Sequence, residues 1–105
     1  MLCVKFKATF IPPLSFEYTR VGLLSEGYFR RGFSKFYSKN NADAIADFKK
    51  AEEKENDLIY NDPSLKDEDR NAGIPDGLGC CYHALGQYEV ALRYYDTAIE
   101  MNKKN

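Results

Sequence analysis

Apolar residues recur at helical spacing along two separate stretches of the chain. Over residues 42–59 they fall mostly three, four or seven positions apart, which is typical of an amphipathic helix. Asn40 or Asn41 can cap the start of this helix, because short polar side chains accept hydrogen bonds from the first free backbone N–H groups. Pro63 predicts its end, since the residue before a proline disfavours the helical conformation.

A shorter helical segment precedes each of these two helices. The pattern predicts helices over residues 26–38 and 75–85, with the second amphipathic stripe following at residues 88–99. Gly86 breaks the second pair, and residues 39–41 occupy the same place in the first pair. The chain is therefore predicted to contain two helix–turn–helix units.

The two units are copies of one another. Gly32 and Gly79 lie 47 positions apart, and four further pairs share this offset. These pairs are Ala44 and Ala91, Ile45 and Leu92, Phe48 and Tyr95, and Ala51 and Ala98. A glycine in the first helix and an alanine in the second allow close backbone approach, and the aromatic residue fills the groove beside them. The next alanine leaves room for a neighbouring unit.

The second unit resembles the tetratricopeptide repeat, whose signature has the same residue types at the same intervals. The first unit matches more loosely, and the two together cover about three quarters of the chain. The residues that carry the resemblance are Tyr28, Gly32, Ala44, Phe48, Ala51, Leu78, Gly79, Tyr82, Ala91, Tyr95 and Ala98. The resemblance implies an all-α fold of antiparallel helix–turn–helix repeats, part of an α-solenoid.

The chain departs from the family pattern at several points. Pro75 stands where the family usually has an aromatic residue, and Lys103 stands where a proline commonly closes the unit. The 47-residue offset exceeds the family's period of about 34 residues, and the excess lies in the charged stretch 55–70. The expected organisation is a first hairpin over residues 26–60, a charged connection over 61–74 and a second hairpin over 75–105.

Residues 1–25 do not follow the repeat. Apolar residues from Leu2 to Phe10 alternate with Cys3, Lys5, Lys7 and Thr9, which is the period of a strand. An all-helical domain offers no partner strand, so an extended or weakly helical tail is expected, with residues 14–24 able to form a helix or cap.

Two repeats are fewer than the roughly three that such proteins need to bury their apolar faces. Two explanations stay open from the sequence: the chain is a piece or isoform of a longer repeat protein, or it pairs with another chain.

The cluster Cys80, Cys81 and His83 invites a chemical interpretation. Adjacent cysteines lack the two-residue gap of a zinc site, and their side chains point about 100° apart on a helix. A Cys–His nucleophilic pair has no accompanying signature of an orienting group or an oxyanion hole. We therefore interpret the cysteines as structural, and we expect neither catalysis nor a bound metal or cofactor.

The carboxylates Glu52, Glu53, Glu55 and Asp57 and the acidic residues at 67–69 lack the spacing and central glycine of a calcium loop. Interleaved lysines indicate a solvated helix face instead.

Composition excludes several partners. With 15 basic and 16 acidic residues, the formal net charge of −1 gives no electrostatic footprint for nucleic acid or an anionic membrane. The apolar runs are too short for a bilayer span, and no secretory signal is visible. Three cysteines without framework spacing favour a reducing compartment, so a cytoplasmic protein is expected.

The resemblance implies that the first helix of each unit lines a concave groove that binds peptide segments or helices of a partner. The candidate groove residues are Phe29, Phe33, Phe36, Tyr37, Asp76, Cys80 and His83. Some of the phenylalanines could instead be ordinary core. Chaperone-binding members of the family use Lys and Asn at the positions of Phe29 and Phe33, so an apolar or amphipathic ligand is expected here. The predicted function is a protein-interaction scaffold, and the alternative is self-association that completes the repeat stack.

Overall fold

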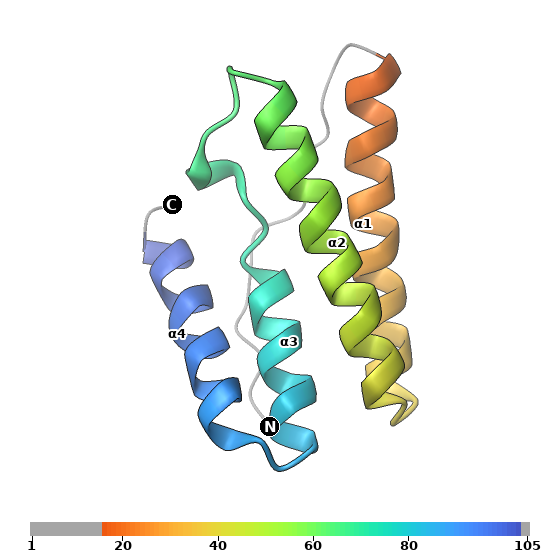
Figure 1. Ribbon diagram of the computed structural model, residues 1–105, viewed down its shortest axis with the longest axis vertical. Coiled ribbons are helices and arrows are strands. Elements are labelled where there is room, and N and C mark those ends of the chain that lie inside the picture. The colour runs from red at the N-terminus through yellow and green to blue at the C-terminus, as the bar shows by residue number, and fades with distance from the viewer. Residues whose placement is uncertain (1–15, 104–105) are drawn as a thin grey trace.

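Four α-helices run up and down as two antiparallel hairpins. A computed structural model describes the backbone of residues 16–103, with side chains described from Leu24 onward except at Asp67. The helices are α1 (Phe16–Tyr37), α2 (Asn41–Asn61), α3 (Gly73–Ala84) and α4 (Tyr88–Lys103), with a short 3₁₀ helix at Asp67–Asp69. Figure 1 shows α1 and α2 side by side, followed by α3 and α4. The described residues hold no strand, so the predicted all-α fold is confirmed.

The two hairpin turns share the same backbone conformation. Lys39 has a φ of 65° and Gly86 has a φ of 81°, so both adopt the left-handed conformation that reverses the chain after a helix. These residues are 47 positions apart, the same offset that relates the two units in the sequence. Glycine adopts this conformation without cost, whereas the lysine is strained there.

Phe48 joins the two hairpins. Its ring lies against Gly32 of α1 on one side and against Gly77 of α3 on the other, so close that a Cβ at these glycines would come 2.9 Å and 2.5 Å from ring carbons. The equivalent aromatic of the second hairpin, Tyr95, lies against Gly79 in the same way, with a closest distance of 2.8 Å. Both hairpins therefore close by placing an aromatic ring of the second helix on a glycine of the first.

Polar contacts reinforce the first hairpin. The guanidinium of Arg31 donates two hydrogen bonds of 2.8 Å to the carboxylate of Asp47, and Lys35 Nζ lies 3.2 Å from the same group. The hydrogen bond from Arg31 is the main reason why the pKa of Asp47 lies below its usual range, with Lys35 acting in the same direction. Ser25 Oγ donates to the carbonyl of Ala51 at 2.9 Å. These contacts fix the register of α1 on α2.

The first helix is longer than the sequence pattern predicts. It begins at Phe16 rather than at residue 26, and so includes most of residues 14–24, which the sequence left open as a helix or cap. Gly22 and Gly27 interrupt the helical pattern, and each costs about 1 kcal/mol relative to alanine in a helix. Contacts of α1 with α2 from Ser25 onward support the helix against that local preference. The strand-like alternation at residues 2–10 lies outside the described residues.

The connection between the hairpins is held by side chains. After α2 ends at Asn61, Asp62 Oδ1 accepts hydrogen bonds from the backbone N–H and hydroxyl of Ser64, which closes a turn around Pro63. The third helix begins at Gly73, two residues before its predicted start at Pro75. Proline is tolerated there because the first turn of a helix has no intrahelical partner for its backbone N–H groups.

Asn40 precedes α2 as expected, but its side chain makes no capping bond to the backbone; the amide donates instead to Asp43 Oδ2 at 2.9 Å.

One carboxylate departs from the predicted solvated face. Glu52, Glu53 and Asp57 are exposed, whereas Glu55 is only 9% exposed. Glu55 Oε2 accepts a 2.7 Å hydrogen bond from the backbone N–H of Asn71, which ties the connection to α2. Burial raises the pKa of Glu55 to about 7, even though the Asn71 hydrogen bond and nearby Arg70 act in the opposite direction.

Candidate functional site

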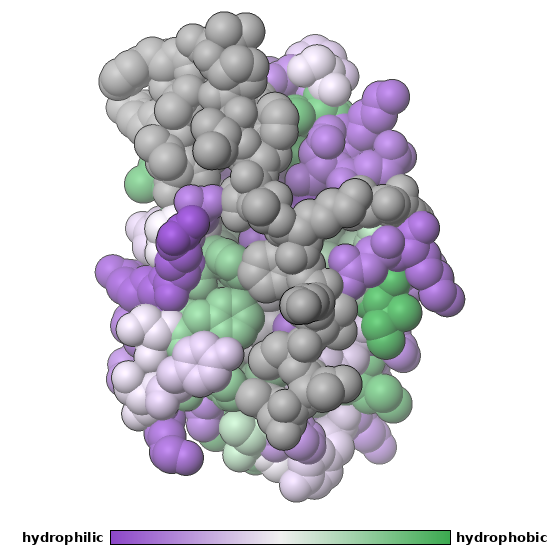
Figure 2. Space-filling model, turned by 180° about the vertical axis from the view of Figure 1, so that it is seen from behind, coloured by the Kyte–Doolittle hydropathy of each residue, from purple (hydrophilic) through white to green (hydrophobic). Residues whose placement is uncertain are grey.

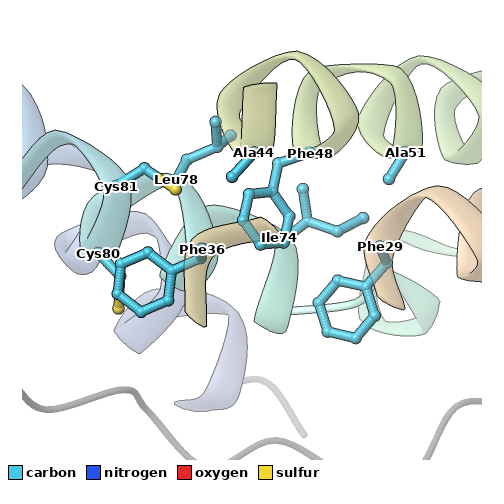
Figure 3. Packing of buried hydrophobic residues seen from close by; sticks show 9 residues of the cluster. All are labelled: Phe29, Phe36, Ala44, Phe48, Ala51, Ile74, Leu78, Cys80 and Cys81. Carbon is cyan, nitrogen blue, oxygen red and sulfur yellow. The ribbon is translucent and has the colours of Figure 1, made fainter. Parts of the chain in front are cut away.

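The candidate site is the side of α1 and α3 that points away from α2, named here the α1/α3 face. Its residues are the seven groove candidates Phe29, Phe33, Phe36, Tyr37, Asp76, Cys80 and His83. In Figure 3, Phe29, Phe36 and Cys80 point to this side, opposite Ala44 and Ala51 of α2. Figure 2, which views the molecule from behind, shows several groups of apolar residues in the middle and lower part of the molecule, with hydrophilic residues among them.

An aromatic ladder follows α1 along this face. Phe29, Phe33 and Tyr37 are spaced four residues apart, which places them one above another on a helix. The Phe29 and Phe33 rings meet edge to face at 5.1 Å, and the Phe33 and Tyr37 rings stack at 6.0 Å. Phe33 also contacts the core ring of Phe48 at 4.9 Å. The ladder therefore connects the exposed Tyr37 to the interior of the repeat.

Exposure along α1 rises toward the C-terminal end of the helix. Phe29 is 4% exposed and Phe36 is 9% exposed, so both belong to the hydrophobic core. Phe33 is half-buried, and Tyr37 is 70% exposed. The predicted alternative, that some of these phenylalanines are core residues, thus describes Phe29 and Phe36.

The third helix shows the same gradient. Asp76 and Cys80 are 0% exposed, whereas His83, one turn further along, is exposed and lies 5.3 Å from the ring of Tyr88. The structure therefore brings Tyr37 and His83 to the same end of the molecule, where both hairpins turn. That end is the accessible part of the α1/α3 face.

The geometry adds no support for a catalytic or metal-binding role of Cys80, Cys81 and His83. Cys80 and Cys81 are both fully buried in the core, whereas His83 is exposed and packs on Tyr88. Among the described residues, no group of three or more His, Cys, Asp or Glu side chains is arranged to hold a metal ion. Nor is any helix within residues 16–103 long and apolar enough to cross a bilayer.

A second apolar surface lies on α4. Tyr88, Leu92 and Ile99 are 64%, 60% and 44% exposed, and their spacing of four and seven residues places them on one side of the helix. Ala91 and Ala98, each about 100° round the helix from the residue that follows it, are buried, and the backbone of Ala91 lies close to Gly79 of α3. In this outer stripe of α4, Leu92 and Ile99 therefore present exposed apolar side chains, whereas Tyr88 also packs on His83 of α3.

The sequence pattern did not identify Gly77 as a contact between the hairpins. The signal that could have found it is its position two residues before the repeat glycine, which places it on roughly the opposite side of α3, toward the preceding hairpin. The Arg31–Asp47 pair also escaped notice, because a salt bridge between two helices has no sequence period.

Two antiparallel helical hairpins that stack through an aromatic ring on a glycine define a helical-repeat protein. Residues 76–105 match the tetratricopeptide repeat family, and the four helices are consistent with two such repeats. The resemblance of the second hairpin to this family, which its residues predicted, is thus confirmed. No curated protein and no solved structure matches the chain. Repeats of this family generally mediate protein–protein interaction.

Proposed function

We propose that the chain is a protein-interaction module that binds an apolar or amphipathic segment of a partner protein on the α1/α3 face. The observation that carries the proposal is the aromatic ladder, which ends in the 70% exposed Tyr37 beside the half-buried Phe33. Exposed aromatic side chains on a rigid, packed base are the groups that dominate binding energy at protein interfaces. Binding there requires no catalytic group and no cofactor.

The electrostatics of the accessible end favour an apolar ligand over a charged one. Phe29 and Phe33 stand where a terminal carboxylate would need cationic or amide side chains, and both rings are engaged with each other. Of the nearby basic residues on α1, Arg31 and Lys35 bind Asp47 of α2, and Arg30 pairs with Glu26 on its own helix. A partner segment would therefore gain affinity from burying apolar side chains against Tyr37 and Phe33.

The test uses peptides selected from a random library for binding to the folded chain. Replacing Tyr37 and His83 together by serine should weaken binding of the selected peptides by about tenfold or more, since each loses a side chain of the accessible surface. The matched control is Tyr60→Ser, because Tyr60 is an 88% exposed tyrosine on α2, away from this face. Equal losses in the control, or unchanged affinity in the double variant, would refute the proposal.

The outer stripe of α4 favours a second candidate function, self-association. Leu92 and Ile99 together present apolar side chains at the spacing of a helix-packing face. Sedimentation velocity over a range of protein concentrations would detect a dimer, and Leu92→Glu should shift it to monomer. A monomer at all concentrations would exclude this candidate and leave the first one standing.

A further inference from the structure

The third helix is buried on every side over most of its length, and its neighbours among the described helices are α1, α2 and α4. Its nine residues from Gly73 to Cys81 are all buried. Because successive helical residues point about 100° apart, nine of them cover the whole circumference. α2 covers one side through Phe48 on Gly77, and α4 covers another through Tyr95 on Gly79. The side that carries Asp76 and Cys80 faces neither contact.

The same side of α1 is covered too. Phe29 and Phe36 lie on the side away from the α2 backbone in Figure 3, where the Phe29 ring also meets the Phe48 ring at 6.1 Å, and they are only 4% and 9% exposed. Tyr37, at the end of the same face, is 70% exposed. A face that is open at one end and closed along most of its length has the burial pattern of a surface with an occupant.

Residues 1–15 have the composition of such an occupant. They precede α1 directly and alternate apolar side chains from Leu2 to Phe10, the pattern of an extended segment with one apolar edge. Pro12 and Pro13 favour extended backbone between that stretch and the helix. The segment contains two lysines and no acidic residue, which complements the carboxyl group of Asp76 on the α1/α3 face.

The length of the segment also fits. Fifteen extended residues reach at most roughly 50 Å, and the 22 residues of α1 span roughly 33 Å. A segment joined to Phe16 can therefore turn back and follow the face from the start of α1 to the open end near Tyr37 and His83.

We propose that residues 1–15 bind the α1/α3 face of their own chain in extended form, so that a partner segment must displace them. The inference rests on the proposed function, since it assigns an internal competitor to the same surface. A tethered competitor acts at an effective concentration of about millimolar, and it weakens the apparent affinity for every other ligand of that surface.

The first arm of the test locates the segment in the intact chain. A nitroxide spin label on Cys3 is selective under native conditions, because Cys80 and Cys81 are 0% exposed. The label should broaden the amide signals of Phe36 and His83 and leave those of Tyr60, at the far end of α2, unchanged. Absence of selective broadening overturns the proposal. Broadening that grows with protein concentration also overturns it, because the occupant is then a second copy.

The second arm measures competition with a synthetic peptide of residues 1–15 added to the whole protein. Phe6→Asp with Phe10→Asp disrupts the apolar edge of the tethered segment, so the variant should bind the peptide more than about tenfold more tightly than the wild-type chain. The matched control, Cys3→Asp with Thr9→Asp, adds the same charge on the opposite edge and should bind like wild type. Circular dichroism checks that all chains remain equally helical.

The outcomes separate the two proposals. If the peptide binds all three chains equally tightly, the face binds apolar segments but is not occupied by the chain's own residues 1–15. In that case the proposed function stands and the inference fails. No binding to any chain, together with no selective broadening, overturns the inference, and the proposed function is then decided by the library-selected peptides alone. Tighter binding to the control as well as to the phenylalanine variant shows an unspecific effect of charge and overturns the inference.

Discussion

Replacing Gly77 by alanine places a methyl group where the ring of Phe48 already lies. The added Cβ would come 2.5 Å from ring Cζ and 2.7 Å from Cε1, whereas carbon atoms in contact normally lie about 3.5–4.0 Å apart. Phe48 is 0% exposed, and the space on its other side is filled by Gly32. The ring therefore cannot yield without separating the first hairpin from α3.

The expected cost follows from two opposing effects. Overpacking a filled core typically costs about 1–3 kcal/mol, and replacing a helical glycine by alanine returns at most about 1 kcal/mol. The net loss in the free energy of unfolding should be about 1–2 kcal/mol. For a chain of this size, each kcal/mol corresponds to a fall of about 4–8 °C in Tm.

Urea denaturation followed by circular dichroism measures this loss. Gly27→Ala is the matched control, because Gly27 is an exposed helical glycine with nothing within 4 Å of an added Cβ; it should stabilise the chain by about 0.5–1 kcal/mol. Combining Gly77→Ala with Phe48→Leu should reduce the penalty of the glycine substitution, since the smaller side chain makes room. A Gly77→Ala variant as stable as Gly27→Ala would refute the inter-hairpin contact.

Three further predictions concern titration and backbone strain. Because burial raises the pKa of Glu55 from 4.5 to about 7, the folded chain binds this proton more tightly than the unfolded chain. The free energy of unfolding should therefore fall as pH rises from about 4.5 to 7. Glu55→Gln should flatten this pH dependence in urea titrations. Asp47 is the opposite case, because Arg31 lowers its pKa in the folded chain. The stability that Asp47 contributes is therefore present above the pKa of the unfolded chain and is lost as pH falls through the lowered pKa of the folded chain. Asp47→Asn should remove this loss of stability at acid pH. Lys39→Gly should raise the free energy of unfolding by about 0.5–1 kcal/mol, and Gly86→Ala should lower it by about 1 kcal/mol, because both residues have positive φ. If thermal melts showed Tm shifting in the same direction in both variants, the shared turn geometry would be contradicted.

The sequence predicted the parts of the fold that depend on residue size at fixed spacing. Gly32 with Phe48, and Gly79 with Tyr95, form one packing arrangement repeated at one offset, so a comparison of the chain with itself reveals it. The turns were predictable for a related reason, since Gly86 and the Lys39–Asn41 stretch interrupt the apolar pattern at equivalent places.

The start of α1 and the burial of Glu55 were beyond sequence reasoning. Gly22 and Gly27 lower local helix propensity, and only packing along α2 makes the helix continuous through them. Glu55 looks like its exposed neighbours in sequence, and its burial depends on the backbone N–H of Asn71, which the connection brings back to α2.

The sequence predicted which positions form the candidate site, but it did not predict how exposed each side chain is. Helical spacing places Phe29, Phe36 and Tyr37 near the same side of α1, yet it cannot distinguish a core residue from a surface residue when both are aromatic. Burial depends on neighbouring elements, and it restricts the accessible part of the face to the end with Tyr37 and His83.

The central claim is that a partner segment binds the α1/α3 face at its open end. The most direct test is an NMR titration of the isotope-labelled chain with a peptide selected for binding. The account predicts that amide shift changes concentrate on Phe33, Tyr37 and His83. Changes concentrated on Leu92 and Ile99 of α4, with the α1/α3 face unaffected, would contradict it.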